Sequence, residues 1–408
     1  MDLSSIRRSF PALDTPWALM DNAGGSAPAN PVLERIQAHL QVRPVQLGAS
    51  YPLSVEASDA VREGREATAR LLGSSPEELV LGPSSTVLLS RLARALVPLW
   101  QPGDEVIVSQ VDHEANRGPW TRLAAQGIVV REWPLDPETH SLRLEELEPL
   151  LGPRTRLVAF THCANVVGQL HDVRALTSRI REAGALSVVD GVAFAPHRRV
   201  DVEALGVDAY AVSLYKVYGP HLGALFVRRE VMLEARGLNH DFYPEDRIPE
   251  KLEPGGVCHE LVAGLPGILE YLEGLVGPVD PSVESGAPRL GVAFEAIAAH
   301  EMELVRPLLG LLREHPQVQL YGCPEADAER RVSTVAFSVR GQASREVVEA
   351  LEGHQLATRF GHFYAPAGVE ALGLEPEDGI VRVSLVHYNT HDEVQRLLGA
   401  LEEALPPR

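Results

Sequence analysis

Lysine is nearly absent from this chain of 408 residues: of its 37 lysine and arginine residues, only Lys216 and Lys251 are lysines. Basic residues are also outnumbered by the 56 acidic residues, so the chain has a formal net charge of −19. Nucleic acids and anionic membranes bind basic surfaces, so this balance argues against a general nucleic-acid binder and against a membrane-held protein. Solubility is a sufficient reason for an acidic surface.

Cysteine, long apolar runs and metal-binding motifs are scarce too. The three cysteines, Cys163, Cys258 and Cys323, are scattered and odd in number, so they do not form a disulfide framework. No run of about 18 apolar residues occurs, and residues 1–14 lack the apolar core of a signal peptide. Since H-E-x-x-H and C-x-x-C are also missing, we expect a reduced, cytoplasmic protein without a metal site.

Length and composition suit a globular protein of two domains, with 45% hydrophobic and 23% charged residues. From about residue 78 to 230, short β-branched runs alternate with amphipathic stretches. Seven of these runs predict strands, at 78–82, 105–110, 128–133, 156–162, 185–190, 209–213 and 223–229. Apolar strands separated by helices are typical of a mostly parallel sheet covered on both faces.

A smaller α/β unit is expected after this region. The patterns predict a long helix, three strands and a terminal helix, at 292–315, 318–322, 332–341, 379–389 and 391–405. The Gly/Pro-rich stretch 274–291 has the composition of a linker. We therefore predict a large domain of residues 20–283 and a small domain formed by 1–19 and 284–408.

Polar side chains follow several predicted strands of the large domain at the point where each strand ends. Asp190 ends one strand and Ser213 another, with Lys216 three residues later, while Asn165 and the hydroxyl cluster 84–86 follow two more. The carboxyl ends of parallel strands share one edge of the sheet, where ligands of such sheets bind. We expect these side chains to meet there.

Lys216 is the most informative of these residues. A neutral amine attacks a carbonyl to form a Schiff base, whereas a guanidinium stays protonated and does not. In a chain where arginine stands at almost every basic position, a lysine is still required wherever its amine takes part in the reaction. The alternative is chance, with one of two remaining lysines simply lying here.

Two further positions are compatible with a phosphorylated, nitrogen-containing ligand. The hydroxyls at 84–86 precede a predicted helix, whose free N–H groups suit a phosphate, although Ser and Thr before a helix are more often only caps. A carboxylate such as Asp190 keeps a neighbouring pyridine nitrogen protonated, which makes the ring a better electron sink. A turn or helix-cap role is the alternative for Asp190.

Together, several motifs of this chain resemble the cysteine desulfurase-like branch of the class V aminotransferase family, which are pyridoxal-phosphate (PLP) enzymes of aminotransferase fold type I. The motifs are DNAGG (21–25), DHEAN (112–116), THCANVV (161–167), the block VVDGVAFAPHRRVDVEALGVDAYAVSLYKVYGPHLGALF (188–226) and VRVSLVHYNT (381–390). The resemblance covers nearly the whole chain. It implies a homodimer, because active sites of this family form between subunits.

The resemblance implies a role for each strand-end residue. Lys216 would carry the cofactor as a Schiff base and move the substrate α-proton. The remaining contacts to PLP would be Asp190 at the pyridine nitrogen, His113 stacked on the ring, Asn165 at the ring oxygen, and Ser85, Thr86, Ser213 and the Tyr215 hydroxyl at the phosphate. For the amino-acid substrate, Arg382 would clamp the carboxylate, and Asn22, Ala23 and Tyr364 complete the expected contacts.

Four positions depart from the family pattern. Tyr364, in GHFYAP, replaces the loop cysteine that accepts a persulfide in desulfurases. Ala193 replaces a Gln or His, Tyr215 replaces the histidine before the lysine, and Gly256 replaces a threonine that reaches the partner subunit's phosphate. The first change makes persulfide-forming activity doubtful, and the last could weaken cofactor binding.

The resulting prediction is a PLP-dependent enzyme that acts on an amino acid, most specifically a C–S lyase that needs no cysteine nucleophile. Alternatives are an aminotransferase or epimerase of the same family, or a non-catalytic protein that keeps the fold. The motifs do not name the amino acid.

Overall fold

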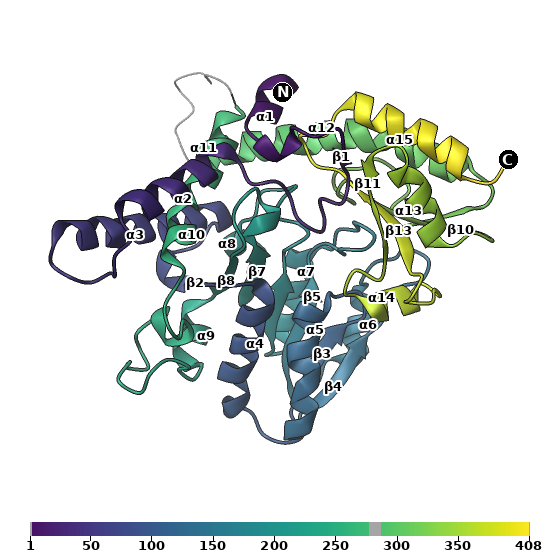
Figure 1. The fold of residues 1–408 in the computed structure, drawn as a ribbon. Helices are drawn as coiled ribbons and strands as arrows, with labels where there is room; N and C mark the ends of the chain where they lie inside the picture. Colours follow the sequence, from purple (N-terminus) through teal and green to yellow (C-terminus); the bar gives the residue numbers. More distant parts are fainter. Residues whose placement is uncertain (1, 277–286, 408) are drawn as a thin grey trace.

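The computed structural model describes residues 2–276 and 287–407, and its centre is a seven-stranded sheet (Figure 1). The strand order is β2-β8-β7-β6-β5-β3-β4. The bounds are β2 Leu79–Gly82, β3 Glu105–Ser109, β4 Val129–Trp133, β5 Thr155–Thr161, β6 Leu186–Asp190, β7 Ala209–Ser213 and β8 Gly223–Val227. Strands β7, β6, β5, β3 and β4 pair in parallel, and β8 pairs antiparallel with both β7 and β2. The predicted mostly parallel sheet is confirmed.

Both faces of this sheet are buried, which explains the continuous apolar strands. In β3, Val106 and Val108 pack on the side of Trp120, whereas Ile107 packs on the opposite face against a separate core. Successive side chains of a strand point to opposite faces, so a strand covered twice needs apolar residues at every position. The N-terminal and sheet-covering helices are α1 Leu3–Arg8, α2 Asn30–Val42, α3 Pro52–Leu72, α4 Ser85–Leu96, α5 Glu114–Thr121, α6 Leu144–Leu147, α7 Val173–Glu182, α8 Val202–Leu205, α9 Arg229–Glu234, α10 His259–Ala263 and α11 Pro266–Gly274.

A second, antiparallel sheet lies in the C-terminal part, in the order β12-β13-β10-β9. The elements of this part of the chain are α12 Ala287–Glu314, β9 Val318–Tyr321, β10 Thr334–Val339, α13 Ser344–Glu352, β11 Leu356–Ala357, β12 Arg359–Gly361, α14 Pro366–Ala371, β13 Ile380–Ser384 and α15 His391–Ala404, of which β11 lies outside the four-stranded sheet. Helices α12 and α15 pack together along the upper edge of this unit in Figure 1. The core between them and the sheet is apolar and separate from the two cores of the large sheet.

The N-terminus joins the C-terminal unit. Strand β1 (Ala18–Leu19) pairs in parallel with β11, and Arg7 donates to the carbonyl of Tyr388 (2.9 Å) and pairs with Glu393. The N-terminal segment therefore packs with the C-terminal unit, while the division into 20–283 and 1–19 plus 284–408 stays a prediction. Of the linker predicted at 274–291, residues 277–286 lie outside the described part of the chain.

Candidate active site

All eight residues predicted to hold the cofactor line one cavity at the carboxyl ends of the sheet strands. Its walls are Ser85, Thr86, His113, Ala115, Thr161, Cys163, Asn165, Asp190, Val192, Ala193, Ser213, Tyr215 and Lys216. The parallel strands β5 and β6 deliver Asn165 and Asp190, and β7 delivers Ser213 and Lys216. The strand-end clustering expected from the sequence is therefore present as geometry.

Lys216 lies in a short 3-10 turn, Leu214–Lys216, directly after β7. Its side chain is buried, with 7% of its surface exposed. Burial is the main cause that lowers the pKa of Lys216 to about 8, and the positive charge of Arg382 lowers it further against the opposing effect of Asp190. The amine makes no hydrogen bond to the part of the chain that the structure describes. It is thus buried, uncommitted and more readily deprotonated than an ordinary lysine.

Asp190 ends β6 and faces the same cavity. Its Oδ1 accepts a hydrogen bond from the N–H of Val192 (2.9 Å). Burial raises the pKa of Asp190, with that hydrogen bond and Lys216 acting in the opposite direction. A buried carboxylate is costly without a cation, so the position favours a ligand that brings a protonated nitrogen.

The hydroxyls that line the cavity at the start of α4 suit a phosphate. Helix α4 begins at Ser85, and the hydroxyl of Ser84 caps it by accepting from the N–H of Val87. Ser85 and Ser213 hydroxyls lie 2.8 Å apart, which brings donors from a helix start and a strand end together. A Cβ on Gly223 would lie 2.4 Å from the carbonyl carbon of Ser84, so only glycine lets β8 approach this helix start.

His113 and Asn165 also line the cavity. His113 Nδ1 accepts from the N–H of Ala115 (2.9 Å), which leaves the ring proton on Nε2. Burial, followed by Lys216 and Arg382, lowers the pKa of His113 to about 4, so the ring is neutral. Asn165 donates from Nδ2 to the carbonyl of Phe363 (3.0 Å), while its buried Oδ1 has no partner among the described residues. An orphaned buried acceptor lining a cavity calls for a ligand donor.

Arg382 lies beside the cavity on β13 and is 2% exposed. Its Nη1 donates to the carbonyl of Asn165 (3.1 Å), and its Nη2 donates to Asp21 Oδ1 (2.7 Å). The guanidinium carbon stands 3.7 Å from the ring centre of Phe363, and Nε is buried without a described partner. Asp21 also lies 3.8 Å from Arg359. The role of Arg382 as a clamp for the substrate carboxylate stays a prediction, and in the structure the carboxylate of Asp21 already takes one of its donors.

Asp21, Phe363 and Arg359 were not among the predicted site residues. Asp21 belongs to the DNAGG motif, which is the one signal that could have identified it. Phe363 stands next to Tyr364 in GHFYAP, where only Tyr364 drew attention, and Arg359 lies outside every motif. The contribution of both depends on how β12 and the following loop fold.

The other predicted substrate contacts are placed differently. The Asn22 amide donates to the carbonyls of Leu19 and Ser384, both at 2.9 Å, and to Asn389 Oδ1, while its oxygen accepts from the Tyr388 hydroxyl. That side chain is saturated by internal bonds, so its predicted substrate contact stays a proposal that would need one of these bonds to open. The N–H of Ala23 donates to the hydroxyl of Ser384.

Tyr364 stands on the loop after β12 and is 58% exposed. Its ring centre is 5.4 Å from that of His113, and its carbonyl accepts from the N–H of Glu114 (2.7 Å). At the position expected to carry the desulfurase cysteine, this loop therefore places a tyrosine beside His113 of the cavity wall.

The remaining departures have physical consequences. Ala193 lines the cavity, and the Tyr215 ring stacks on His221 with ring centres 4.6 Å apart. Gly256 has φ +79°, a conformation that a threonine adopts only with strain. Cys163 lines the cavity, but burial raises the pKa of its thiol to about 12, so it is not a reactive thiolate.

These residues fit PLP. The uncommitted amine of Lys216, the buried Asp190 carboxyl, the orphaned Asn165 oxygen and the hydroxyls at the start of α4 match its aldehyde, ring nitrogen, ring hydroxyl and phosphate.

The chain belongs to the class V aminotransferase family, whose model matches residues 18–271 and 290–397. Aminotransferase-like protein FGM3 of Gibberella zeae is 39% identical, over 99% of this chain and 98% of that protein. Cysteine desulfurase-like protein ustD of Aspergillus flavus is 32% identical, over 99% and 90%. Among solved structures, the apo cysteine desulfurase of Thermococcus onnurineus superposes with a TM-score of 0.87 at 26% identity, covering 98% of this chain and 97% of that one.

This membership confirms the predicted family, the fold type I architecture and the PLP dependence. Family members are enzymes that act on small amino-acid substrates. Within the described residues, no helix is both long enough and apolar enough to cross a bilayer.

Proposed function

We propose that this protein is a PLP-dependent lyase that removes a sulfur substituent from the β-carbon of an amino acid without a cysteine nucleophile. The observation that carries this proposal is the combination of a buried, uncommitted Lys216 amine with a loop that presents Tyr364 in place of a thiol. The cavity's own thiol, Cys163, is held protonated by burial.

PLP, when bound, supplies an electron sink for the negative charge that develops at the substrate α-carbon. Lys216 would take the α-proton, since its lowered pKa of about 8 makes the amine a usable base near neutral pH. Asp190 would hold the ring nitrogen protonated, and Arg382 would hold the substrate carboxylate. The Cβ–S bond then breaks, sulfur leaves with the electron pair and is protonated to a thiol, and water releases ammonia and a keto acid.

A homodimer is part of the proposal. Helix α2 and the start of α3 extend away from the body of the protein (Figure 1). They expose large apolar side chains, namely Leu33, Leu40, Val42, Tyr51, Leu53 and Val55. An apolar patch of this kind marks an interaction surface, and a second copy of the chain would cover it.

Transamination is the second candidate. The relative FGM3, at 39% identity, is described as aminotransferase-like. The same residues would serve if the proton taken by Lys216 were returned to the cofactor instead of a substituent leaving.

The test is to record visible absorption of the PLP-loaded protein with L-cysteine, S-methyl-L-cysteine and L-alanine, and to assay keto acid and ammonia. We expect the cofactor band to shift and then recover with the sulfur amino acids, with the two co-products formed in equal amounts. Conversion to the pyridoxamine form with L-alanine would replace the lyase by an aminotransferase. Absence of α-proton exchange in deuterated water with all three would overturn both enzymatic assignments.

A further inference from the structure

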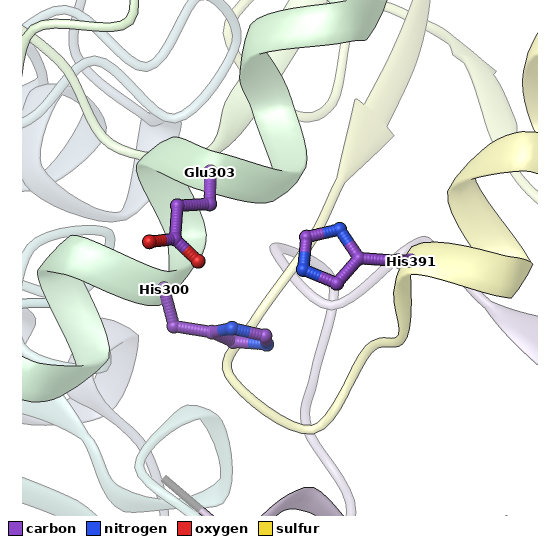
Figure 2. Close-up of side chains that lie close together, drawn as sticks. All are labelled: His300, Glu303 and His391. Carbon is purple, nitrogen blue, oxygen red and sulfur yellow. The ribbon is translucent and has the colours of Figure 1, made fainter.

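Three side chains with metal-binding atoms converge in the C-terminal unit (Figure 2), and none of them lines the active-site cavity. They are His300 and Glu303 of α12 and His391, the first residue of α15. One ligand atom from each lies within 4.8 Å of the other two. We propose that these residues form a binding site for a divalent zinc-like ion that joins α15 to α12.

The donor set suits zinc. Two imidazoles and one carboxylate are an established ligand combination for Zn²⁺, which takes four ligands in a tetrahedron, leaving one position for water. With metal–ligand distances of about 2.0 Å, donor atoms on such an ion stand about 3.3 Å apart. Glu303 and His391 are exposed, so small side-chain rotations close the remaining gap. Mg²⁺ prefers oxygen ligands and is not expected to compete.

The ligand atoms are free to bind. Throughout residues 2–276 and 287–407, no hydrogen bond or ion pair engages the carboxylate of Glu303 or the ring of His391. His300 Nε2 donates to the carbonyl of Asn389 (3.2 Å), which leaves Nδ1 with its lone pair. A hydrogen bond from the second ring nitrogen to a carbonyl is the usual way in which proteins orient a metal-binding histidine.

The helices that carry the ligands are held in place independently. Next to His300, Glu301 is fully buried and bonds His197 Nδ1 (2.8 Å), which fixes the rotation of α12. Positions three apart on a helix share one face, so His300 and Glu303 then point together.

His391 is fixed by the start of its own helix. The hydroxyl of Thr390 accepts from the N–H of Glu393, and the Glu393 side chain accepts from the N–H of Thr390, a complete capping box. Asn389 is buried and bonded to the carbonyl of Leu19 (3.0 Å). The site is therefore assembled by the fold rather than by the metal.

Zn²⁺ titration of the PLP-loaded protein, after removal of metals with a chelator, tests the proposal. We expect one equivalent of Zn²⁺ to bind, insensitive to millimolar Mg²⁺, and to raise the melting temperature. His391→Ala and Glu303→Gln should each weaken binding about 100-fold or more and abolish the thermal shift. Both side chains are exposed, so neither change threatens folding.

The matched control is His354→Ala. His354 is also a histidine of the C-terminal unit, 3.4 Å from a carboxylate oxygen of Glu403, but no third ligand joins them among the residues that the structure describes. This variant should bind Zn²⁺ as the unmodified protein does. Failure of the unmodified protein to bind one equivalent, or equal binding by His391→Ala and Glu303→Gln, would overturn the site.

Discussion

Replacing Asp21 should strengthen substrate binding, because Asp21 already pairs with Arg382, the proposed partner of the substrate carboxylate. In the structure Arg382 Nη2 donates to Asp21 Oδ1 at 2.7 Å, and this contact joins a fully buried guanidinium to a carboxylate that is 28% exposed. A substrate carboxylate that needs both Nη and Nε must displace that oxygen. Asp21→Asn removes the charge but keeps an oxygen that can still accept.

The size of the effect follows from the loss of charge. Hydrogen bonds to charged groups contribute about 1.5–3 kcal/mol, roughly twice the contribution of neutral ones. Replacing the charged hydrogen bond by a neutral one lowers the free energy that the substrate needs to displace residue 21 from Arg382 by about 1 kcal/mol. That change corresponds to about fivefold tighter substrate binding. The free energy of unfolding should fall by about 1–3 kcal/mol, because buried Arg382 then lacks a countercharge. Binding and stability are thus expected to change in opposite directions.

The assay is a titration of the cofactor band with L-cysteine, together with urea unfolding of the same preparations. Asp59→Asn is a suitable control, since Asp59 pairs with Arg62 on an exposed face of α3, and both quantities should stay unchanged. Weaker binding of L-cysteine to Asp21→Asn would refute the competition, because it would mean that Asp21 aims Arg382 at the substrate.

Three further perturbations follow from the same structure. Lys216→Ala should abolish the borohydride-fixable cofactor band while leaving the far-ultraviolet circular dichroism unchanged; a band fixed to another residue would contradict the assignment. In the cofactor-free protein, the rate of PLP capture should rise with pH and level off above about 8, because only the neutral Lys216 amine attacks and its pKa is lowered to about 8. Stopped-flow absorption measures this rate, and a rate that does not change with pH would contradict the prediction. Gly64→Ala should destabilise the protein by about 1–3 kcal/mol in urea unfolding, since the new Cβ would lie 2.0 Å from the carbonyl oxygen of Val262. Gly310→Ala, at a position of α12 with open space around it, should instead stabilise the protein by about 0.5–1 kcal/mol. Equal effects of the two substitutions on stability would refute the steric reasoning.

The large sheet could be predicted from the sequence because burial on both faces leaves long apolar strands, and β5, β6 and β7 begin or end within about one residue of the predicted limits. The grouping of Lys216 with Asp190 followed from the parallel pairing of those strands. Strand β12 and helices α13 and α14 were not anticipated. Arg359–Gly361 is only three residues long and only partly buried, which leaves no periodic pattern to detect.

The interactions around Arg382 could not be predicted for a different reason. Its partner Asp21 is 361 positions away in the chain, and β1 and β11 bring the two ends together. Nothing in either local sequence reports that pairing. The same holds for His391, which meets His300 and Glu303 only because α15 packs against α12, so a search for metal motifs within one segment could not find the set.

Lys251, the second lysine of the chain, is also buried, and its contacts suit an ammonium better than a guanidinium. It is 1% exposed, and Nζ donates to the carbonyls of Leu233 (3.1 Å) and Glu245 (2.7 Å). A compact ammonium directs its donors to two carbonyls at once, whereas a planar guanidinium is larger and presents a fixed fork. Lys251→Arg should therefore destabilise the protein by about 1–3 kcal/mol in urea unfolding, while Arg247→Lys, an exposed position in the same segment, should change stability by less than about 0.5 kcal/mol. If Lys251→Arg left the free energy of unfolding unchanged, the structure would give no reason for a lysine at position 251. The inference that lysine is required at position 216 would then rest only on the chemistry of its amine.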